Sequence, residues 1–270
     1  MKNVRIALAV MNCPVGRNRE NLERVDHWTA EAGRQGVQIL CFPELCISGY
    51  TTRSMAADTA ECVPGPAADR LQQLAGREKV VILAGLAEKD DAGRVYAGHL
   101  VVTPEGLAGS YRKLHIAPPE RGVFTAGSDV PLFSAYGIRF GIQLCYDAHF
   151  PELSTRMALE GADLIFMPHA SPRGTPDDKF NSWSRHLTAR AFDNGLFVAA
   201  CNQTGSNRMG LQFPGLAVVV GPSGEIIARA ADAAEGLLVV DLKAAALNHV
   251  REHRMRYFLP NRRPEIYRTK

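Results

Sequence analysis

The chain has 270 residues, of which 46% are hydrophobic and 22% are charged, as in an ordinary globular protein with a large core. Its 31 Lys and Arg residues against 28 Asp and Glu residues leave a net charge of +3, too small a bias to favour nucleic acid as a partner. No apolar run approaches the length of a membrane span, so no membrane partner is expected.

Residues 1–16, MKNVRIALAVMNCPVG, carry Arg5 inside a short apolar run and have no small-residue cleavage site. A first strand is therefore expected there rather than a signal peptide. The six cysteines are scattered without a CxxC pair, at Cys13, Cys41, Cys46, Cys62, Cys145 and Cys201. A chain of this size does not need disulfides, so free thiols in a reducing cytoplasm are expected.

Strand and helix patterns alternate along the chain. The expected strands, in chain order, are 4–12, 37–45, 80–89, 95–106, 107–116, 131–147, 163–171, 196–203, 215–230 and 235–243. The expected helices are 18–36, 67–78, 150–162, 177–195 and 244–254. Several strands are apolar throughout, which predicts that they are buried on both faces or face a second sheet. The interleaved helices indicate the α/β class, and the absence of a linker predicts one domain over residues 1–270.

Cys145 ends an apolar, β-prone run in GIQLCYDAHFPE, residues 141–152. Free cysteine is most often a buried core residue, and that interpretation suits the other five. Cys145 differs because it stands where a strand ends, the place at which open α/β sheets put their sites. A helix is expected to begin at Pro151, and helix N-termini stabilise thiolates. Cys145 is thus either a core residue or a nucleophile.

A cysteine nucleophile needs a proton acceptor. His149 is near in sequence and His169 lies in the strand-end segment MPHASP, so a Cys–His pair is one hypothesis. Two charged residues compete with it: Glu44 ends the buried run in FPELCISGY, and Lys113 lies in the β-like run YRKLHI. Taken alone, each is more often a solvated strand end than a catalytic group. No two histidines have metal-ligand spacing with carboxylates or thiols nearby, so no metal is expected.

Taken together, these motifs strongly resemble the nitrilase, or carbon–nitrogen hydrolase, superfamily, whose triad is Glu-Lys-Cys in chain order. FPELCISGY carries Glu44, YRKLHI carries Lys113 and CYDAHFPE carries Cys145. ERGVFTAGSD resembles the segment in which many members have a second glutamate, here Glu120. The resemblance extends from RIALAVMN to NRRPEIY. It departs at His149, where many relatives have arginine, and at TAG, where TPG is common.

The resemblance implies a four-layer α-β-β-α sandwich that pairs into a homodimer or a higher homo-oligomer, without a metal or organic cofactor. It implies that Glu44 accepts the thiol proton and that Cys145 attacks a carbonyl to form a thioester. Lys113 and the Tyr146 N–H would hold the oxyanion, and Glu120 would keep Lys113 charged and aimed. Apolar neighbours should raise the pKa of Glu44 toward the working range.

The expected enzyme is an amidase that releases ammonia from a small amide. True nitrilases typically show Cys-Trp-Glu at the nucleophile, whereas Cys145-Tyr146-Asp147 resembles the amidase and carbamoylase branches. An N-carbamoyl amino acid would also need a cation for its carboxylate, and Arg173 is the candidate. An N-carbamoyl amidohydrolase, a nitrilase and a non-catalytic scaffold on the same fold remain alternatives, because a fold does not prove an activity.

Tyr50 and His169 are further candidates for the substrate pocket. Tyr50 is ambiguous between pocket wall and core, and core is the commoner environment for His169. Residues 250–270 form a basic tail broken by prolines, yet this tail carries the large apolar residues Tyr257, Phe258, Leu259, Ile266 and Tyr267. We expect it to dock at or near a dimer interface rather than to be disordered.

Overall fold

The apolar runs form two six-stranded sheets in the computed structural model, which describes residues 1–267. The first sheet contains β1 (Val4–Val10), β2 (Ile39–Cys41), β3 (Val81–Lys89), β4 (Val95–Thr103), β5 (Gly106–Arg112) and β14 (Gly236–Leu242). The second contains β6 (Phe133–Ala135), β7 (Ile138–Ile142), β8 (Leu164–His169), β9 (Phe197–Asn202), β12 (Ala217–Val220) and β13 (Ile226–Ala230). Their spatial orders are β14-β1-β2-β3-β4-β5 and β13-β12-β9-β8-β7-β6, and β10 (Thr204–Ser206) pairs separately with β11 (Gln212–Pro214).

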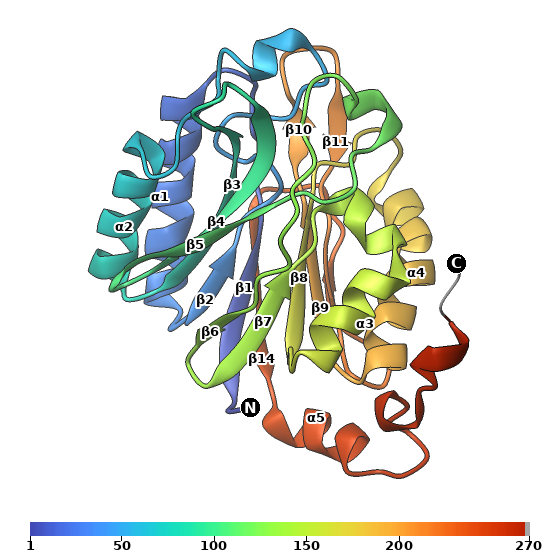
Figure 1. Ribbon diagram of the computed structural model, residues 1–270. Coiled ribbons are helices and arrows are strands. Elements are labelled where there is room, and N and C mark those ends of the chain that lie inside the picture. Colours follow the sequence, from blue (N-terminus) through green and yellow to red (C-terminus); the bar gives the residue numbers. More distant parts are fainter. Residues whose placement is uncertain (268–270) are drawn as a thin grey trace.

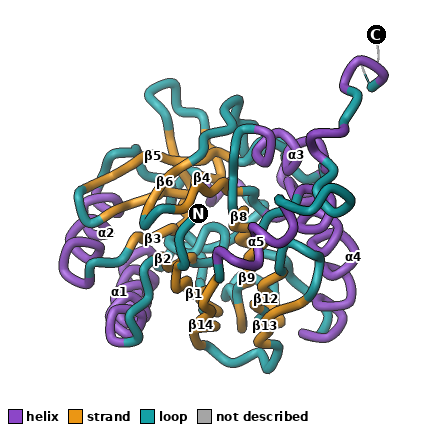
Figure 2. Tube along the Cα trace, turned by 90° about the horizontal axis from the view of Figure 1, so that it is seen from below, coloured by secondary structure: helices purple, strands orange, loops and turns teal. Residues whose placement is uncertain are grey.

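Helices cover the outer face of each sheet (Figures 1 and 2). The helices are α1 (Asn18–Arg34), α2 (Pro66–Glu78), α3 (Pro151–Leu159), α4 (Pro176–Asn194) and α5 (Ala244–Arg251). The pair α1 and α2 lies against the first sheet, and the pair α3 and α4 lies against the second. The predicted single-domain, four-layer α-β-β-α sandwich is thereby confirmed.

Strand β1 shows how the sequence builds two cores. Its residues alternate between faces, as the period of two in a strand requires. Ile6 and Leu8 pack into the core between the sheets, whereas Ala7 and Ala9 pack into the core beneath α1 and α2. From Ile6 to Val10 the strand is therefore apolar at every position because both of its faces are buried, whereas Arg5 near its start is exposed.

Strand direction brings several loops to one edge of the sandwich. Strands β1, β2 and β3 are parallel, and β5 runs with them because β4 is antiparallel to both of its neighbours. In the second sheet β7, β8 and β9 are parallel. Parallel strands end at the same edge, so the segments after β2, β5, β7 and β8 can share one site.

The expected element boundaries differ from the structure where the chain leaves a sheet. The strand expected over 37–45 pairs only over Ile39–Cys41, after which the chain turns toward Glu44. The run 131–147 contains two short strands joined by a turn at Tyr136 and Gly137, both with positive φ. The strand expected over 107–116 ends at Arg112.

The tail of residues 250–267 passes from α5 toward α3 (Figure 2). Arg262 and Tyr267 line a hollow together with Thr155 and Leu159 of α3. The exposed large apolar residues of the tail are Met255, Phe258, Ile266 and Tyr267. Residues 268–270 of the tail lie outside the described residues, and its interface role stays a prediction, as does the cytoplasmic location. None of the helices within residues 1–267 is long and apolar enough to span a membrane.

Gly85 in β3 lets the loop carrying Glu44 approach the sheet. A Cβ at Gly85 would lie 2.5 Å from Leu45 N and 2.9 Å from His99 Nδ1. We expect Gly85→Ala to lower the free energy of unfolding by about 1–3 kcal/mol, the usual cost of overpacking. Urea denaturation measures the free energy of unfolding. Gly236→Ala is the matched control, because no atom lies within 4 Å of a Cβ placed at Gly236. A Gly85→Ala protein as stable as the control would contradict the close approach.

Candidate active site

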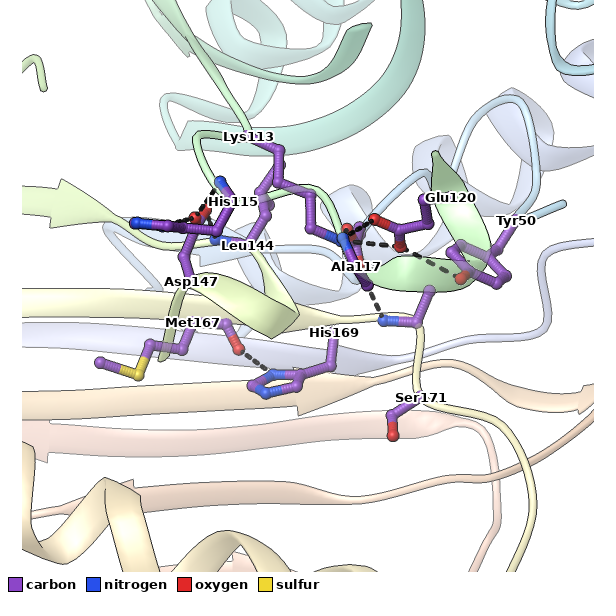
Figure 3. A network of polar contacts seen from close by, with 12 residues as sticks. Tyr50, Lys113, His115, Ala117, Glu120, Leu144, Asp147, Met167, His169 and Ser171 are labelled. Carbon is purple, nitrogen blue, oxygen red and sulfur yellow. Dashed lines mark hydrogen bonds and ion pairs between the residues drawn. The ribbon is translucent and has the colours of Figure 1, made fainter. Parts of the chain in front are cut away.

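The predicted catalytic residues meet at the common strand edge. Lys113 follows directly after β5, and its Nζ lies 2.8 Å from Glu44 Oε1 and 2.8 Å from Glu120 Oε1 (Figure 3). Lys113 and Glu44 are fully buried, and Glu120 is 3% exposed. Residues 69 positions apart in the chain are thus joined in one network, which the order of the motifs alone does not reveal.

Glu44 is held at both its side chain and its main chain. Its Oε2 accepts a hydrogen bond from the Ala170 N–H at 3.0 Å, just after β8, and its carbonyl oxygen accepts one from Gln203 Nε2 at 2.8 Å. The next residue, Leu45, has φ +52, in the left-handed region that non-glycine residues seldom occupy. The second sheet therefore fixes a carboxylate that belongs to the first.

One ammonium faces two carboxylates, and this imbalance sets the charge state of the site. Burial raises the pKa of Glu44 to about 7, against the pull of Lys113 and with a further contribution from Glu120. Burial alone would lower the pKa of Lys113, but the opposed carboxylates hold it well above its usual value. Lys113 thus stays an ammonium while Glu44 can gain or lose a proton near neutral pH.

Glu120 is positioned at the end of the short 3₁₀ turn Pro118–Glu120. Its Oε2 accepts the Ala117 N–H at 3.1 Å, and its Oε1 accepts the Tyr50 hydroxyl at 3.1 Å in addition to Lys113. These donors anchor Glu120 against Lys113, as Figure 3 shows. Tyr50, a candidate for the substrate pocket, is buried here and orients the second glutamate through its hydroxyl.

Cys145 begins a 3₁₀ turn, Cys145–His149, three residues after β7 ends. Its φ of +44 places it in the left-handed region, a sharp turn that leaves the side chain partly exposed. Helix α3 starts only at Pro151, and burial raises the pKa of the Cys145 thiol above its usual value, with Glu44 adding to the rise. Burial and the nearby Glu44 carboxylate therefore favour the neutral thiol in the resting protein, and helix α3 begins six residues beyond it in the chain.

The remaining cysteines are free thiols in the described residues. Four of them are buried as expected: Cys13, Cys41, Cys46 and Cys201. Cys62 is exposed, so its assignment to the core is wrong. It lies in the loop before α2, where no strand or helix face packs it away.

Asp147 is the site residue that sequence analysis missed. Its Oδ2 accepts the Tyr111 hydroxyl at 2.8 Å and the Leu144 N–H at 3.0 Å, and its Oδ1 accepts the His115 N–H at 2.8 Å. It is fully buried. These bonds tie the Cys145 turn to the segment carrying Lys113. The signal in the sequence was an acidic residue three positions after Leu144, where a carboxylate can cap the start of a turn.

The other predicted site residues fall in different environments. His169 is 2% exposed, its Nδ1 lies 2.7 Å from Met167 O, and its ring packs on Trp183 at 4.0 Å between centroids. Burial lowers the pKa of His169 well below the usual value, so its ring is neutral. This environment favours a core residue over a residue of the substrate pocket. Arg173 is exposed in the β8–α4 loop. Tyr146 is partly exposed. The first hydrogen bond of the 3₁₀ turn is donated by the Asp147 N–H to the Leu144 carbonyl oxygen, so the Tyr146 N–H is not used by the turn and can donate to a substrate oxygen.

The described residues contain no group of three or more His, Cys, Asp and Glu side chains that could hold a metal ion. The polar groups of the site instead pair with one another, so the chemistry they can perform is proton transfer, nucleophilic attack and stabilisation of negative charge.

This fold and this arrangement of a buried acid, a buried ammonium and a turn cysteine define a class of hydrolase. The family model for carbon-nitrogen hydrolases matches residues 5–252. The chain belongs to the carbon–nitrogen hydrolase family. The prediction of an enzyme of the amidase class, a hydrolase of carbon–nitrogen bonds, is thereby confirmed.

Solved and curated relatives match most or nearly all of the chain. The amidase of Nesterenkonia sp. AN1 is 29% identical, with a TM-score of 0.84 over 98% of this chain and 98% of that one. A structure of a mutant of that enzyme shows the result of Michael addition of acrylamide at the active-site cysteine. A nitrilase of Pyrococcus abyssi is 30% identical over 98% of this chain and 99% of its own. An (R)-stereoselective amidase of a Pseudomonas species is 33% identical over 70% of this chain and 67% of its own.

The bonds to Asp147 predict a specific pattern of stability. Asp147→Asn replaces an acceptor oxygen by a donor, so buried donors lose their partner and the free energy of unfolding should fall by about 1–3 kcal/mol. Tyr111→Phe removes one donor and leaves the carboxylate intact, so it should cost about 0.5–1.5 kcal/mol. Urea unfolding of both variants tests the order. A larger loss in Tyr111→Phe than in Asp147→Asn would show that the carboxylate is not what holds the turn.

Proposed function

We propose that the protein hydrolyses small amides through a thioester on Cys145 and releases ammonia. The observation that carries the proposal is the buried Glu44–Lys113–Glu120 network beside a strained, partly exposed cysteine. A scaffold gains nothing from burying a lysine and two glutamates, because removing such ions from water is costly. The amidase relatives support the same reaction.

The first half of the reaction uses Glu44 as a base. Its carboxylate accepts the proton of the Cys145 thiol as sulfur attacks the amide carbonyl, which suits a thiol whose pKa burial has raised. The carbonyl oxygen becomes an oxyanion, stabilised by the Lys113 ammonium and the Tyr146 N–H. Glu44 then passes its proton to the amide nitrogen, the C–N bond breaks, ammonia leaves and a thioester remains.

The second half returns the enzyme to its starting state. Glu44, again ionised, takes a proton from water as the water oxygen attacks the thioester carbonyl. The same two donors hold the second oxyanion. The C–S bond breaks, the acid product leaves, and the proton on Glu44 returns to the Cys145 sulfur. Glu120 does not touch the substrate in this scheme; it keeps Lys113 charged and aimed through the 2.8 Å contact.

Amides suit this site better than nitriles do. An amide already has a carbonyl oxygen for Lys113 and Tyr146 to polarise, whereas a nitrile has none until water or thiol has been added. An N-carbamoyl compound offers the same carbonyl and is the second candidate. For an N-carbamoyl amino acid the predicted partner of the carboxylate is Arg173, which is exposed in the β8–α4 loop.

Cys145→Ala should abolish turnover and leave the fold intact, because it removes the nucleophile from a turn without opening a large cavity. Ammonia release from propionamide or butyramide measures the loss, and thermal unfolding checks the fold. Cys201→Ala, at a buried thiol of the core, is the matched control and should keep most of the activity. Iodoacetamide at neutral pH should label Cys145 in the Cys62→Ser protein, which lacks the exposed thiol. Full activity in Cys145→Ala would refute the mechanism.

The acid limb of kcat/KM should lie near pH 7, because Glu44 must be ionised to accept a proton and burial raises its pKa to about 7. The Glu120 carboxylate contributes to that rise. Glu120→Gln should therefore move the limb to lower pH, even where it also lowers the maximal rate. Profiles of kcat/KM from about pH 5 to about pH 9 on one amide measure the shift. A limb that moves upward in Glu120→Gln would contradict this charge balance.

A matched substrate series tests the reaction class. We expect kcat/KM to be highest for the amide of a short aliphatic chain, lower for the N-carbamoyl form and lowest for the nitrile. A nitrile preferred by tenfold, about 1.4 kcal/mol of transition-state free energy, would overturn the amidase assignment. A preferred carbamoyl form, with the preference lost in Arg173→Ala, would favour the second candidate instead.

A further inference from the structure

Asn202 is a fully buried polar residue that the proposed mechanism does not use. It is the last residue of β9 and pairs with His169, the last residue of β8, in the parallel ladder of the second sheet. Beyond that point the Asn202 side chain continues the pairing. Its Oδ1 accepts the Ser171 N–H at 2.9 Å, and its Nδ2 donates to the Ser171 carbonyl oxygen at 3.0 Å. One side chain thus binds both polar main-chain groups of Ser171.

This reciprocal pair requires an amide at residue 202. The main chain of Ser171 offers one donor and one acceptor, and an amide side chain can satisfy both at once. A carboxylate would place an oxygen against the Ser171 carbonyl oxygen, and an aliphatic side chain would leave both main-chain groups without this partner. The position of the segment after β8 therefore depends on the Asn202 amide.

The segment held by Asn202 carries the N–H that binds the proposed base. Ala170 directly precedes Ser171, is 2% exposed and donates its N–H to Glu44 Oε2 at 3.0 Å. The residue after Asn202, Gln203, donates to the Glu44 carbonyl oxygen at 2.8 Å. Two consecutive residues at the end of β9 thus fix both partners of the contact between the Ala170 N–H and the Glu44 carboxylate.

The Ala170 N–H also faces the proposed nucleophile. Burial raises the pKa of the Cys145 thiol, and a hydrogen bond from the Ala170 N–H is among the contributions that lower it. The flanking residues His169 and Ser171 mark where this segment passes the buried network in Figure 3. One main-chain donor therefore serves both Glu44, which moves the proton, and the sulfur that gives the proton up.

We propose that Asn202 is a positioning residue of the reaction, which aims the Ala170 N–H at the base and at the nucleophile. The inference rests on the proposed amidase function. In the first half of the reaction, the thiol proton moves to Glu44, and the N–H is then free to stabilise negative charge on the attacking sulfur. In the second half, the C–S bond breaks while Glu44 holds the proton taken from water, and the N–H stabilises the leaving sulfur. The main-chain hydrogen stays on its nitrogen throughout.

The pKa of Glu44 reports on this donor. Burial raises that pKa to about 7, and the Ala170 N–H is among the contributions that lower it. The titratable groups that act on Glu44 or feel its charge are Lys113, Glu120, Cys145, Tyr50 and Tyr111. A hydrogen bond to the ionised carboxylate stabilises it, so loss of the N–H raises the pKa further. The acid limb of kcat/KM, which requires ionised Glu44, then moves to higher pH.

Asn202→Leu removes the amide, nearly keeps the size of the side chain and adds no charge. We expect the acid limb of kcat/KM on butyramide to move up by about one pH unit, the order of one hydrogen bond to a charged group. Asn194→Leu is the matched control, because Asn194 is also a buried amide that donates to a main-chain oxygen, but at the end of α4. It should leave the limb in place even where it lowers thermal stability.

A second variant tests the donor itself. Replacement of Ala170 by L-lactic acid changes one main-chain N–H to an ester oxygen and leaves the methyl side chain in place. It should move the acid limb in the same direction, at least as far as Asn202→Leu does. Alkylation of Cys145 by iodoacetamide at neutral pH, in the Cys62→Ser protein, should slow in both variants because the thiolate loses a donor. A merely structural role would lower the midpoint of thermal unfolding and move neither readout.

The outcomes separate the two groups and the function on which they rest. A folded Asn202→Leu protein with the acid limb and alkylation rate of wild type would overturn the role of Asn202, and Asn202→Ala takes its place if the leucine variant does not fold. The same result for the lactic acid variant would overturn the role of the Ala170 N–H. Failure of wild type to hydrolyse butyramide would overturn the proposed function itself, and the alkylation rates would still decide the role of the donor.

Discussion

A single buried ammonium, that of Lys113, is the constraint on which the site depends. Removing an ion from water costs several kcal/mol, so it is tolerated only where opposite charges and hydrogen bonds replace the lost hydration. Glu44 and Glu120 supply them, each at 2.8 Å. Glu44 can do so only because Ala170 of the second sheet and Gln203 hold it in turn. The two sheets must therefore pack together before Lys113 can be buried.

The same arrangement explains why the acid near the cysteine is unusual. A lone ion pair would hold Glu44 ionised far below neutral pH, whereas burial and a second carboxylate raise its pKa to about 7. The backbone is strained on both sides of the reaction centre, at Leu45 and Cys145. Such strain persists only where the surroundings over-determine it, here through the buried Asp147 and the close approach at Gly85. The strained backbone at Leu45 and Cys145 lowers the stability of the fold locally, and in return it fixes the geometry of the site.

The two sheets contribute different functions to the site. The first supplies the charged groups, since Glu44 and Lys113 follow β2 and β5. The second supplies the candidate nucleophile, Cys145, after β7 and the N–H of Ala170 that anchors Glu44 after β8. Helix α4 packs against this half of the site, where Trp183 contacts His169 and His186 contacts His149.

The apolar runs of the sequence indicated the α/β class, because they are local patterns. The three ordered motifs carried the family resemblance, which implied the four layers and nominated Glu44, Lys113, Glu120 and Cys145 as catalytic residues. The sequence did not reveal the roles of Asp147 and Ala170, since these arise from contacts between segments far apart in the chain. It also misjudged Cys62, which is exposed. Burial decides such a residue's environment, and burial is a property of the packed sheets and helices, which no local pattern encodes.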